Sequence, residues 1–173
     1  MKSIAKSDSK YQVEILNRQR RYKLAPDQLR QFAYLVLTSM ELAPTQVSLV
    51  FVGDLRMRQL NRDYRAIDKS TDVLSFSYND GVDLDPDGDN YLGDVVISPQ
   101  TAAKYAEKLG LTFDQELKYL ILHGILHLCG YDHEADNGEM VQLEQRLRER
   151  LLADNPKPQS LYQDIALPSQ GLI

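Results

Sequence analysis

Apolar and polar residues follow two different periods along this chain, and the period separates predicted strands from predicted helices. Residues 11–15 alternate apolar and polar side chains, the pattern of a half-buried strand. The run from Val47 to Val52 is rich in β-branched and aromatic residues, which favours a central strand. Residues 73–77 and 92–98 are two further short apolar runs of this kind. The pattern therefore predicts four strands.

Five other segments repeat their apolar residues every three or four positions, as the buried face of a helix does. Pro26 suits the start of the first helix and Asp54 the cap of the second. Thr112 and Gln115 have the spacing of a capping box. The predicted helices cover, to within a few residues, 26–42, 54–64, 99–110, 113–128 and 140–151.

The lengths of these segments predict one domain and no internal repeat. We expect a loose N-terminal segment at 1–10, a single domain at 11–154 and an irregular C-terminal tail at 155–173, which contains three prolines. The segment 79–90 is acidic and rich in turn residues. Its aspartate spacing imitates a calcium loop, but it lies between two predicted strands, so a solvated hairpin loop is the favoured interpretation.

Composition narrows the class of protein. The chain has 173 residues, of which 43% are hydrophobic, and its net charge is −5. No apolar run is long enough to cross a membrane, and the first residues lack a signal-peptide core. The single cysteine, Cys129, excludes an intrachain disulfide and is expected to be a small buried residue. We therefore expect a cytoplasmic protein with no membrane or DNA partner, although a local basic groove for RNA remains compatible with the net charge.

All three histidines of the chain lie within eleven residues. His123 and His127 are one helical turn apart, so both imidazoles can point toward one position. Gly130 can end the helix in the left-handed conformation and return His133 to the same place. Three neutral imidazoles with an open fourth position form a catalytic zinc site. The alternative, ordinary histidines on a buried helix, explains this clustering less well.

Two neighbours of the histidines have open interpretations. Gly124 stands where zinc peptidases of this spacing carry a glutamate base. Glycine inside a helix costs about 1 kcal/mol relative to alanine, so we expect that the fold needs space there for substrate or for a close-packed neighbour. Asp132 is either an orienter of one imidazole or an exposed turn residue.

Basic residues form two groups. Residues 18–23 contain four Arg or Lys side chains and are expected to form a solvated loop rather than a binding patch. Arg58, Arg62 and Arg65 can share one helix face, and composition alone leaves that face equally open to solvent exposure or to function.

With these motifs identified, the chain resembles the YbeY family of metal-dependent endoribonucleases, the rRNA maturation factors. Three blocks that together span about residues 11–152 carry the resemblance: His123-Gly-x-Leu-His127-Leu-x-Gly130-Tyr-Asp132-His133, Leu60-Asn-x-x-Tyr64-Arg65-x-x-Asp68-x-x-Thr71-Asp72-Val-Leu-Ser-Phe76 and Leu92-Gly-Asp94-Val-x-Ile-Ser98.

The resemblance implies an α+β, zincin-like single domain in which a small mixed sheet of about four strands packs with about five helices. It implies one Zn²⁺ per chain, held by His123, His127 and His133, and a catalytic role for Arg65 in RNA cleavage. The implied substrate is single-stranded ribosomal RNA. Small ribosomal subunit proteins and an assembly GTPase are further candidate partners.

Two other functions compete with RNA cleavage. One is a zinc metallohydrolase of a peptide or small amide, which would need a general base that Gly124 cannot supply. The other is a non-catalytic ribosome-assembly factor with a structural zinc, which would need a fourth protein ligand. Cys129 is the only sulfur candidate for that ligand, and it lies on a different helical face from His127. Phosphodiester cleavage instead needs charge stabilisation of the kind that a metal and an arginine supply together.

Overall fold

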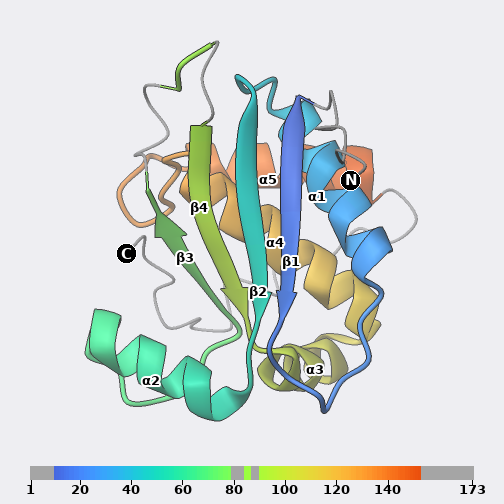
Figure 1. The fold of residues 1–173 in the computed structure, drawn as a ribbon, viewed down its shortest axis with the longest axis vertical. Coiled ribbons are helices and arrows are strands. Elements are labelled where there is room, and N and C mark those ends of the chain that lie inside the picture. The colour runs from blue at the N-terminus through green and yellow to red at the C-terminus, as the bar shows by residue number, and fades with distance from the viewer. Residues whose placement is uncertain (1–9, 79–83, 87–89, 153–173) are drawn as a thin grey trace, which may run out of the picture.

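The structure is a computed structural model that describes residues 10–78, 84–86 and 90–152. Within these residues, four strands form one mixed sheet (Figure 1). The predicted N-terminal segment up to residue 9, most of the acidic loop and the C-terminal tail lie outside the described residues. The strand order is β1-β2-β4-β3. β1, β2 and β4 are parallel, and β3 pairs antiparallel with β4 at one edge. The bounds are β1 (Tyr11–Asn17), β2 (Thr45–Phe51), β3 (Val73–Ser77) and β4 (Asn90–Ile97).

Five helices accompany the sheet in the described residues, as the apolar periodicity predicts. They are α1 (Pro26–Ser39), α2 (Asp54–Arg65), α3 (Pro99–Leu109), α4 (Phe113–Leu128) and α5 (Glu139–Leu151). α1 ends three residues before the predicted Leu42, because Glu41 adopts a left-handed φ of 53° and the amide of Met40 closes the last turn on Val36. The α+β class and the small mixed sheet are therefore confirmed.

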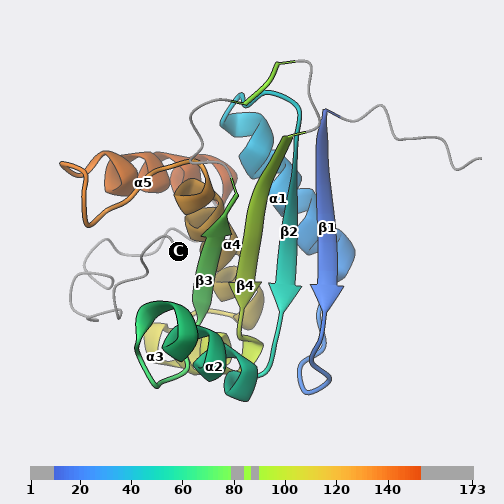
Figure 2. The same cartoon turned by 60° about the vertical axis from the view of Figure 1, so that its left-hand side comes forward.

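The two faces of the sheet pack against different helices (Figures 1 and 2). On β2, Val47, Leu49 and Phe51 are fully buried in the larger core, together with residues of α1, α4 and α5. Val50 of β2 and Val52, just after the strand, pack in a smaller cluster with Met57 of α2. This division follows from the two-residue period of a strand, and it places α2 and α4 on opposite faces of the sheet.

The prediction that Asp54 caps α2 is wrong. Gly53 occupies the N-cap position, and no side chain caps this helix. The Asp54 carboxylate instead accepts hydrogen bonds from Ser98 Oγ at 2.5 Å, Thr101 Oγ1 at 2.8 Å and Ser70 Oγ at 3.1 Å. Burial raises the pKa of Asp54, but these hydroxyls and Lys104 outweigh that effect and lower it. Asp54 therefore ties the start of α2 to the start of α3.

Helix α4 is the centre of the fold, and the predicted signals at both of its ends are confirmed. Thr112 and Gln115 form the capping box in both directions. Gly130 has a left-handed φ of 87°, and the following amide of Tyr131 bonds to the carbonyl of Leu126, which ends the helix. Within the part of the chain that the structure describes, no helix is both long and apolar enough to span a membrane.

Candidate metal centre

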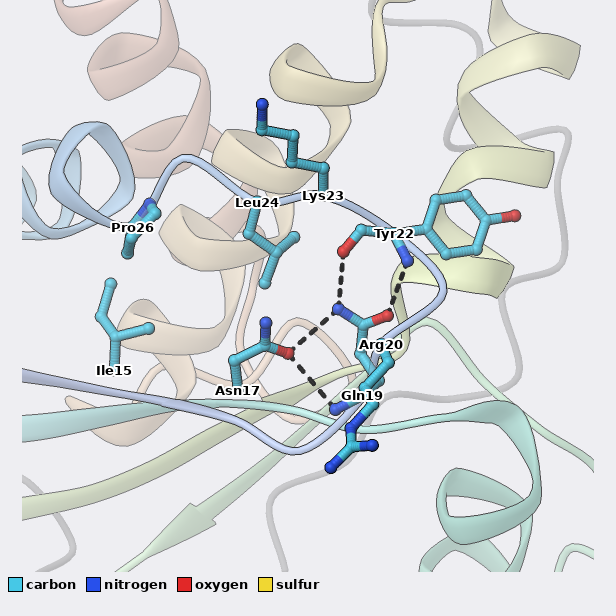
Figure 3. Close-up of a pocket in the computed structure, with 8 residues that line it drawn as sticks. All are labelled: Ile15, Asn17, Gln19, Arg20, Tyr22, Lys23, Leu24 and Pro26. Atoms are coloured by element: carbon cyan, nitrogen blue, oxygen red, sulfur yellow. Dashed lines mark hydrogen bonds between the residues drawn. The ribbon is translucent and has the colours of Figure 1, made fainter.

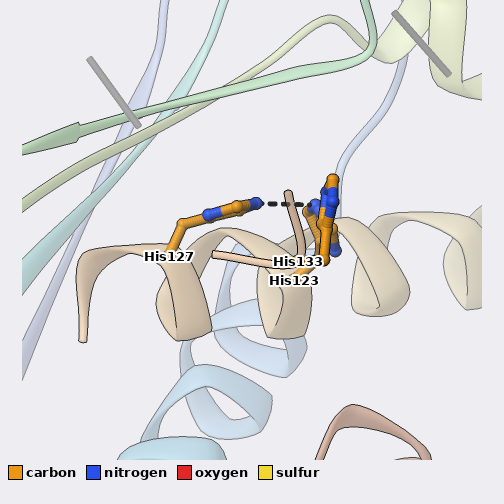
Figure 4. Close-up of side chains that lie close together, drawn as sticks. All are labelled: His123, His127 and His133. Carbon is orange, nitrogen blue, oxygen red and sulfur yellow. Dashed lines mark hydrogen bonds between the residues drawn. The ribbon is translucent and has the colours of Figure 1, made fainter. Parts of the chain in front are cut away.

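The last two turns of α4 and the loop that follows bring the three histidines together (Figure 4). The Nε2 atoms of His123 and His127 lie 3.2 Å apart. The ring of His133 lies with its centroid 5.5 Å from that of His123 and 5.3 Å from that of His127. One ring nitrogen from each residue lies within 4.8 Å of the other two. The helix-and-turn spacing in the sequence therefore produces the convergence that it predicts.

Burial keeps the His127 imidazole neutral. His127 is only 1% exposed and His123 only 7%, whereas His133 is partly exposed. Burial, reinforced by the neighbouring charges of His123 and His133, lowers the pKa of His127 to about 3. Neutral imidazole is the form that binds a metal, so proton competition at His127 is weak near neutral pH. The partly exposed ring of His133 leaves one side of the cluster accessible.

The residues present fit a tetrahedral metal ion. Bonds of about 2.0–2.1 Å place two tetrahedral ligands about 3.4 Å apart, close to the observed 3.2 Å between the Nε2 atoms of His123 and His127. Cys129 does not belong to the group of three donors found in the described residues. It packs against the core, and burial raises the pKa of its thiol to about 12. A metal site with three protein ligands, none of them sulfur, has the composition of a catalytic site rather than a structural one.

Gly124 is required by packing, which answers the question that the sequence leaves open. A Cβ atom at this position would lie 2.4 Å from Val95 Cγ1 and 3.2 Å from Ser75 Oγ. The Ser75 hydroxyl also donates a hydrogen bond to the Gly124 carbonyl at 3.2 Å. The glycine therefore lets α4 approach β3 and β4 closely, and the close neighbour is the sheet rather than open space for substrate.

The carboxylate beside the imidazoles comes from α5, and sequence reasoning missed it. Asp132 has the turn role, because its Oδ1 accepts from the Glu134 amide at 3.0 Å. Glu144 places Oε1 at 3.4 Å and Oε2 at 3.5 Å from His123 Nδ1. The only signal in the sequence is its position: Glu144 lies four residues after Met140 and three before Leu147, on the buried face of α5.

Arg65 is the last residue of α2 and is partly buried. Burial lowers the pKa of its guanidinium, while the negative charge of Glu134 raises it. Glu134 directly follows His133, and Figure 1 shows the end of α2 and the loop after α4 on the same side of the molecule, beside β3. The exposed ion pair with Asp68 is formed by Arg58, through contacts of 2.8 and 2.7 Å. Arg62 also lies 3.8 Å from Asp68, so Arg58 and Arg62 share that carboxylate, whereas Arg65 is influenced by the charge of Glu134, the residue after His133.

A separate hollow of about 450 Å³ lies in the basic loop between β1 and α1 (Figure 3). Its polar groups hold the loop itself: the Gln19 side chain bonds to Asn17 and to both backbone groups of Tyr22. The ring of Tyr22 contacts Phe113, the first residue of α4, with centroids 5.4 Å apart. Ten residues of helix separate Phe113 from His123, about 15 Å. The hollow is thus remote from the histidines, and the predicted solvated loop is what the structure contains here.

The fold and the histidine cluster together define a class: a small α+β protein whose central helix and following turn can hold one metal ion through three imidazoles. Comparison with known proteins names the family within this class. The family model described as Endoribonuclease YbeY matches residues 14–152. This chain belongs to the YbeY family, as its three sequence blocks predict.

Individual relatives cover most of the chain. It is 42% identical over 140 residues to an Endoribonuclease YbeY of Geobacter sulfurreducens, which covers 79% of this chain and 91% of the relative. It is 41% identical over 150 residues to an Endoribonuclease YbeY of Syntrophotalea carbinolica, with 81% and 98% covered. A solution structure from Thermotoga maritima is 27% identical, has a TM-score of 0.58 and covers 82% of this chain and 90% of its own. The sequence matches therefore show the family, and the solved structure shares the fold.

Proposed function

We propose that this protein is an endoribonuclease that cleaves single-stranded ribosomal RNA during rRNA maturation and ribosome quality control, with one Zn²⁺ held by His123, His127 and His133. The observation that carries the proposal is the convergence of three ring nitrogens within 4.8 Å in a chain of an endoribonuclease family. We assign these histidines and Arg65 to a single domain at 11–154. We place the protein in the cytoplasm, with small ribosomal subunit proteins and an assembly GTPase as further partners.

The residues divide the chemistry between them. His123, His127 and His133 would hold the metal, which when bound would supply Lewis acidity for phosphodiester cleavage. Arg65 binds the non-bridging oxygens through its guanidinium fork and stabilises the charge that develops as the bond breaks. Its partial burial strengthens this interaction, because charges attract more strongly where water is excluded. His133, the least buried of the three histidines, marks the side from which RNA reaches the site.

The competing functions have weaker support. A peptidase of this spacing needs a carboxylate base next to His123, and the adjacent position is Gly124, packed against Val95. A structural zinc needs a fourth protein ligand, and Cys129 is held in the core instead. RNA cleavage requires neither of these features.

The test is an assay of the zinc-loaded protein on labelled single-stranded RNA, duplex RNA and a panel of peptides. We expect cleavage of the single-stranded RNA alone. Arg65→Ala should fold and keep its metal but lose about a hundred- to a thousandfold in rate, the cost of removing one transition-state hydrogen-bond donor. Arg65→Lys should recover only part of the rate, because it keeps the charge without the fork.

Arg56→Ala is the matched control, since Arg56 is an exposed arginine on the same helix that donates a hydrogen bond to Gln59 at 3.3 Å. Its cleavage rate should equal that of the unmodified protein. Cleavage by Arg65→Ala at the unmodified rate would remove Arg65 from the mechanism. If the unmodified, metal-loaded protein left every RNA intact, the non-catalytic interpretation would replace the proposal.

A further inference from the structure

A buried ion pair on α5 reaches into the histidine cluster from outside the family motif. Glu144 is 8% exposed, and its two carboxylate oxygens lie 3.4 and 3.5 Å from His123 Nδ1. Arg148, one turn further along α5, forms an ion pair with the same carboxylate. The Arg148 guanidinium lies over the ring of Tyr119, 4.9 Å from its centroid. Tyr119 precedes His123 by one turn of α4, so these side chains link the two helices beside the cluster.

Core packing does not explain a carboxylate at this position. Met140 and Leu147, the neighbours of Glu144 on the buried face of α5, are both apolar. A buried charge is costly unless it is paired, and a buried ion pair is often no more stabilising than well-packed apolar residues. Arg148 supplies the charge partner that a buried carboxylate needs, so the fold keeps the Glu144 carboxylate next to one imidazole.

The geometry of the His123 ring shows what this carboxylate does. Nδ1 faces Glu144, whereas Nε2, on the opposite side of the ring, faces His127 at 3.2 Å. A carboxylate at Nδ1 accepts a hydrogen bond from the Nδ1–H tautomer, which leaves the lone pair on Nε2. The same hydrogen bond makes Nε2 more basic and fixes the plane of the ring.

We propose that Glu144 is the positioning residue of the metal centre: it holds His123 as the Nδ1–H tautomer, with Nε2 directed at the metal, while Arg148 holds Glu144. This inference rests on the metal site of the proposed function. It concerns one ligand only. Among the described residues, Nδ1 of His127 has no hydrogen-bond partner, so no carboxylate hydrogen-bonds to His127 in this way. Asp132, the candidate in the motif, bonds to the turn instead.

The experiment compares zinc affinity by competition with a chromophoric chelator in the purified full-length chain. Glu144→Gln keeps the size and one acceptor oxygen but removes the charge, and we expect its affinity to fall about 10- to 100-fold, as for other such partners of ligating histidines. Glu144→Leu should lose more, although it fills the core position. Glu149→Gln is the control, because Glu149 is exposed on the same helix and makes the same charge change.

A second measurement separates positioning from folding. In the metal-free protein, ¹⁵N NMR of the imidazoles should report the Nδ1–H tautomer of His123 in the unmodified chain and a mixture in Glu144→Leu. Urea midpoints should identify any variant that is merely unstable. Equal zinc affinity and an unchanged His123 tautomer in folded Glu144→Gln and Glu144→Leu would overturn the inference. Failure of the unmodified chain to bind zinc would instead overturn the metal site of the proposed function.

Discussion

The contact between α4 and the sheet at Gly124 makes a quantitative prediction. Replacing Gly124 with alanine adds one methyl group in a helix, which by itself favours the folded state. The added Cβ would lie 2.4 Å from Cγ1 and 3.0 Å from Cγ2 of Val95, and 3.2 Å from Ser75 Oγ. Contacts below 3.0 Å force the neighbouring atoms to move. Val95 lies fully buried on β4, so it has no free space to move into.

The two effects of Gly124→Ala oppose each other. Helix propensity favours alanine by about 1 kcal/mol. Overpacking a well-packed core costs about 1–3 kcal/mol, and the upper end applies here because both methyl groups of Val95 face the new atom. Rotation about χ1 of Val95 would move one methyl group away from the new Cβ atom but bring the other toward it, so rotation relieves little of the clash. We therefore expect a net loss of about 2 kcal/mol, or about 4–8 °C in Tm for a domain of this size.

A double-mutant cycle with Val95→Ala tests the cause of this loss. Val95→Ala alone creates a cavity and destabilises the protein, but it removes both clashing methyl groups. In that background Gly124→Ala should be neutral or stabilising by up to about 1 kcal/mol, which gives a coupling energy of about 2–3 kcal/mol. Urea unfolding of the four proteins measures the cycle. An equal cost of Gly124→Ala in both backgrounds would refute the role of Val95.

Two further predictions concern the histidines. Elemental analysis of the purified chain should show about one equivalent of zinc. His127→Ala should lose most of this zinc, because the two remaining ligands hold the ion weakly. Full retention of zinc by His127→Ala would contradict the assignment of the metal ligands. The metal-free protein should lose stability as the pH falls from about 6.5 toward 3. In the unfolded chain His127 takes up a proton near pH 6.5. In the folded protein the buried His127 ring has a pKa of about 3 and stays neutral, so protonation favours the unfolded chain. Between pH 6.5 and 5 this loss amounts to about 1–2 kcal/mol, measurable as a lower urea midpoint, and His127→Ala should reduce it.

The features of the fold and the site that could be predicted depend on residues that are close together in the sequence. The capping box of Thr112 and Gln115 and the left-handed Gly130 each depend on residues within a few positions. The spacing of His123 and His127 is also local, since one helical turn decides which way both rings point. Local physics therefore determines the helix ends and most of the histidine cluster.

The features that could not be predicted depend on contacts between residues that are far apart in the sequence. Glu144 acts on His123 across 21 residues, and its position depends on how α5 packs on α4. Asp54 reads as a helix cap in the sequence, but its partners Ser98 and Thr101 lie 44 and 47 residues away. A short polar side chain can serve either role, and only the tertiary arrangement decides between them. The insertion of β4 between β2 and β3 is likewise a property of the whole sheet.

The structure also explains why the histidine spacing of a zinc peptidase does not bring peptidase chemistry with it. The Cα–Cβ direction at position 124 points toward Val95 and Ser75, into the interface between α4 and the sheet. A glutamate placed there would meet the strands before it could reach the histidine cluster, so Gly124→Glu should destabilise the fold rather than supply a base. Position 124, next to His123, therefore allows α4 to pack close to β3 and β4. The proposed RNA cleavage relies instead on charge stabilisation, the role that we assign to Arg65, and this suits a phosphodiester better than an amide bond.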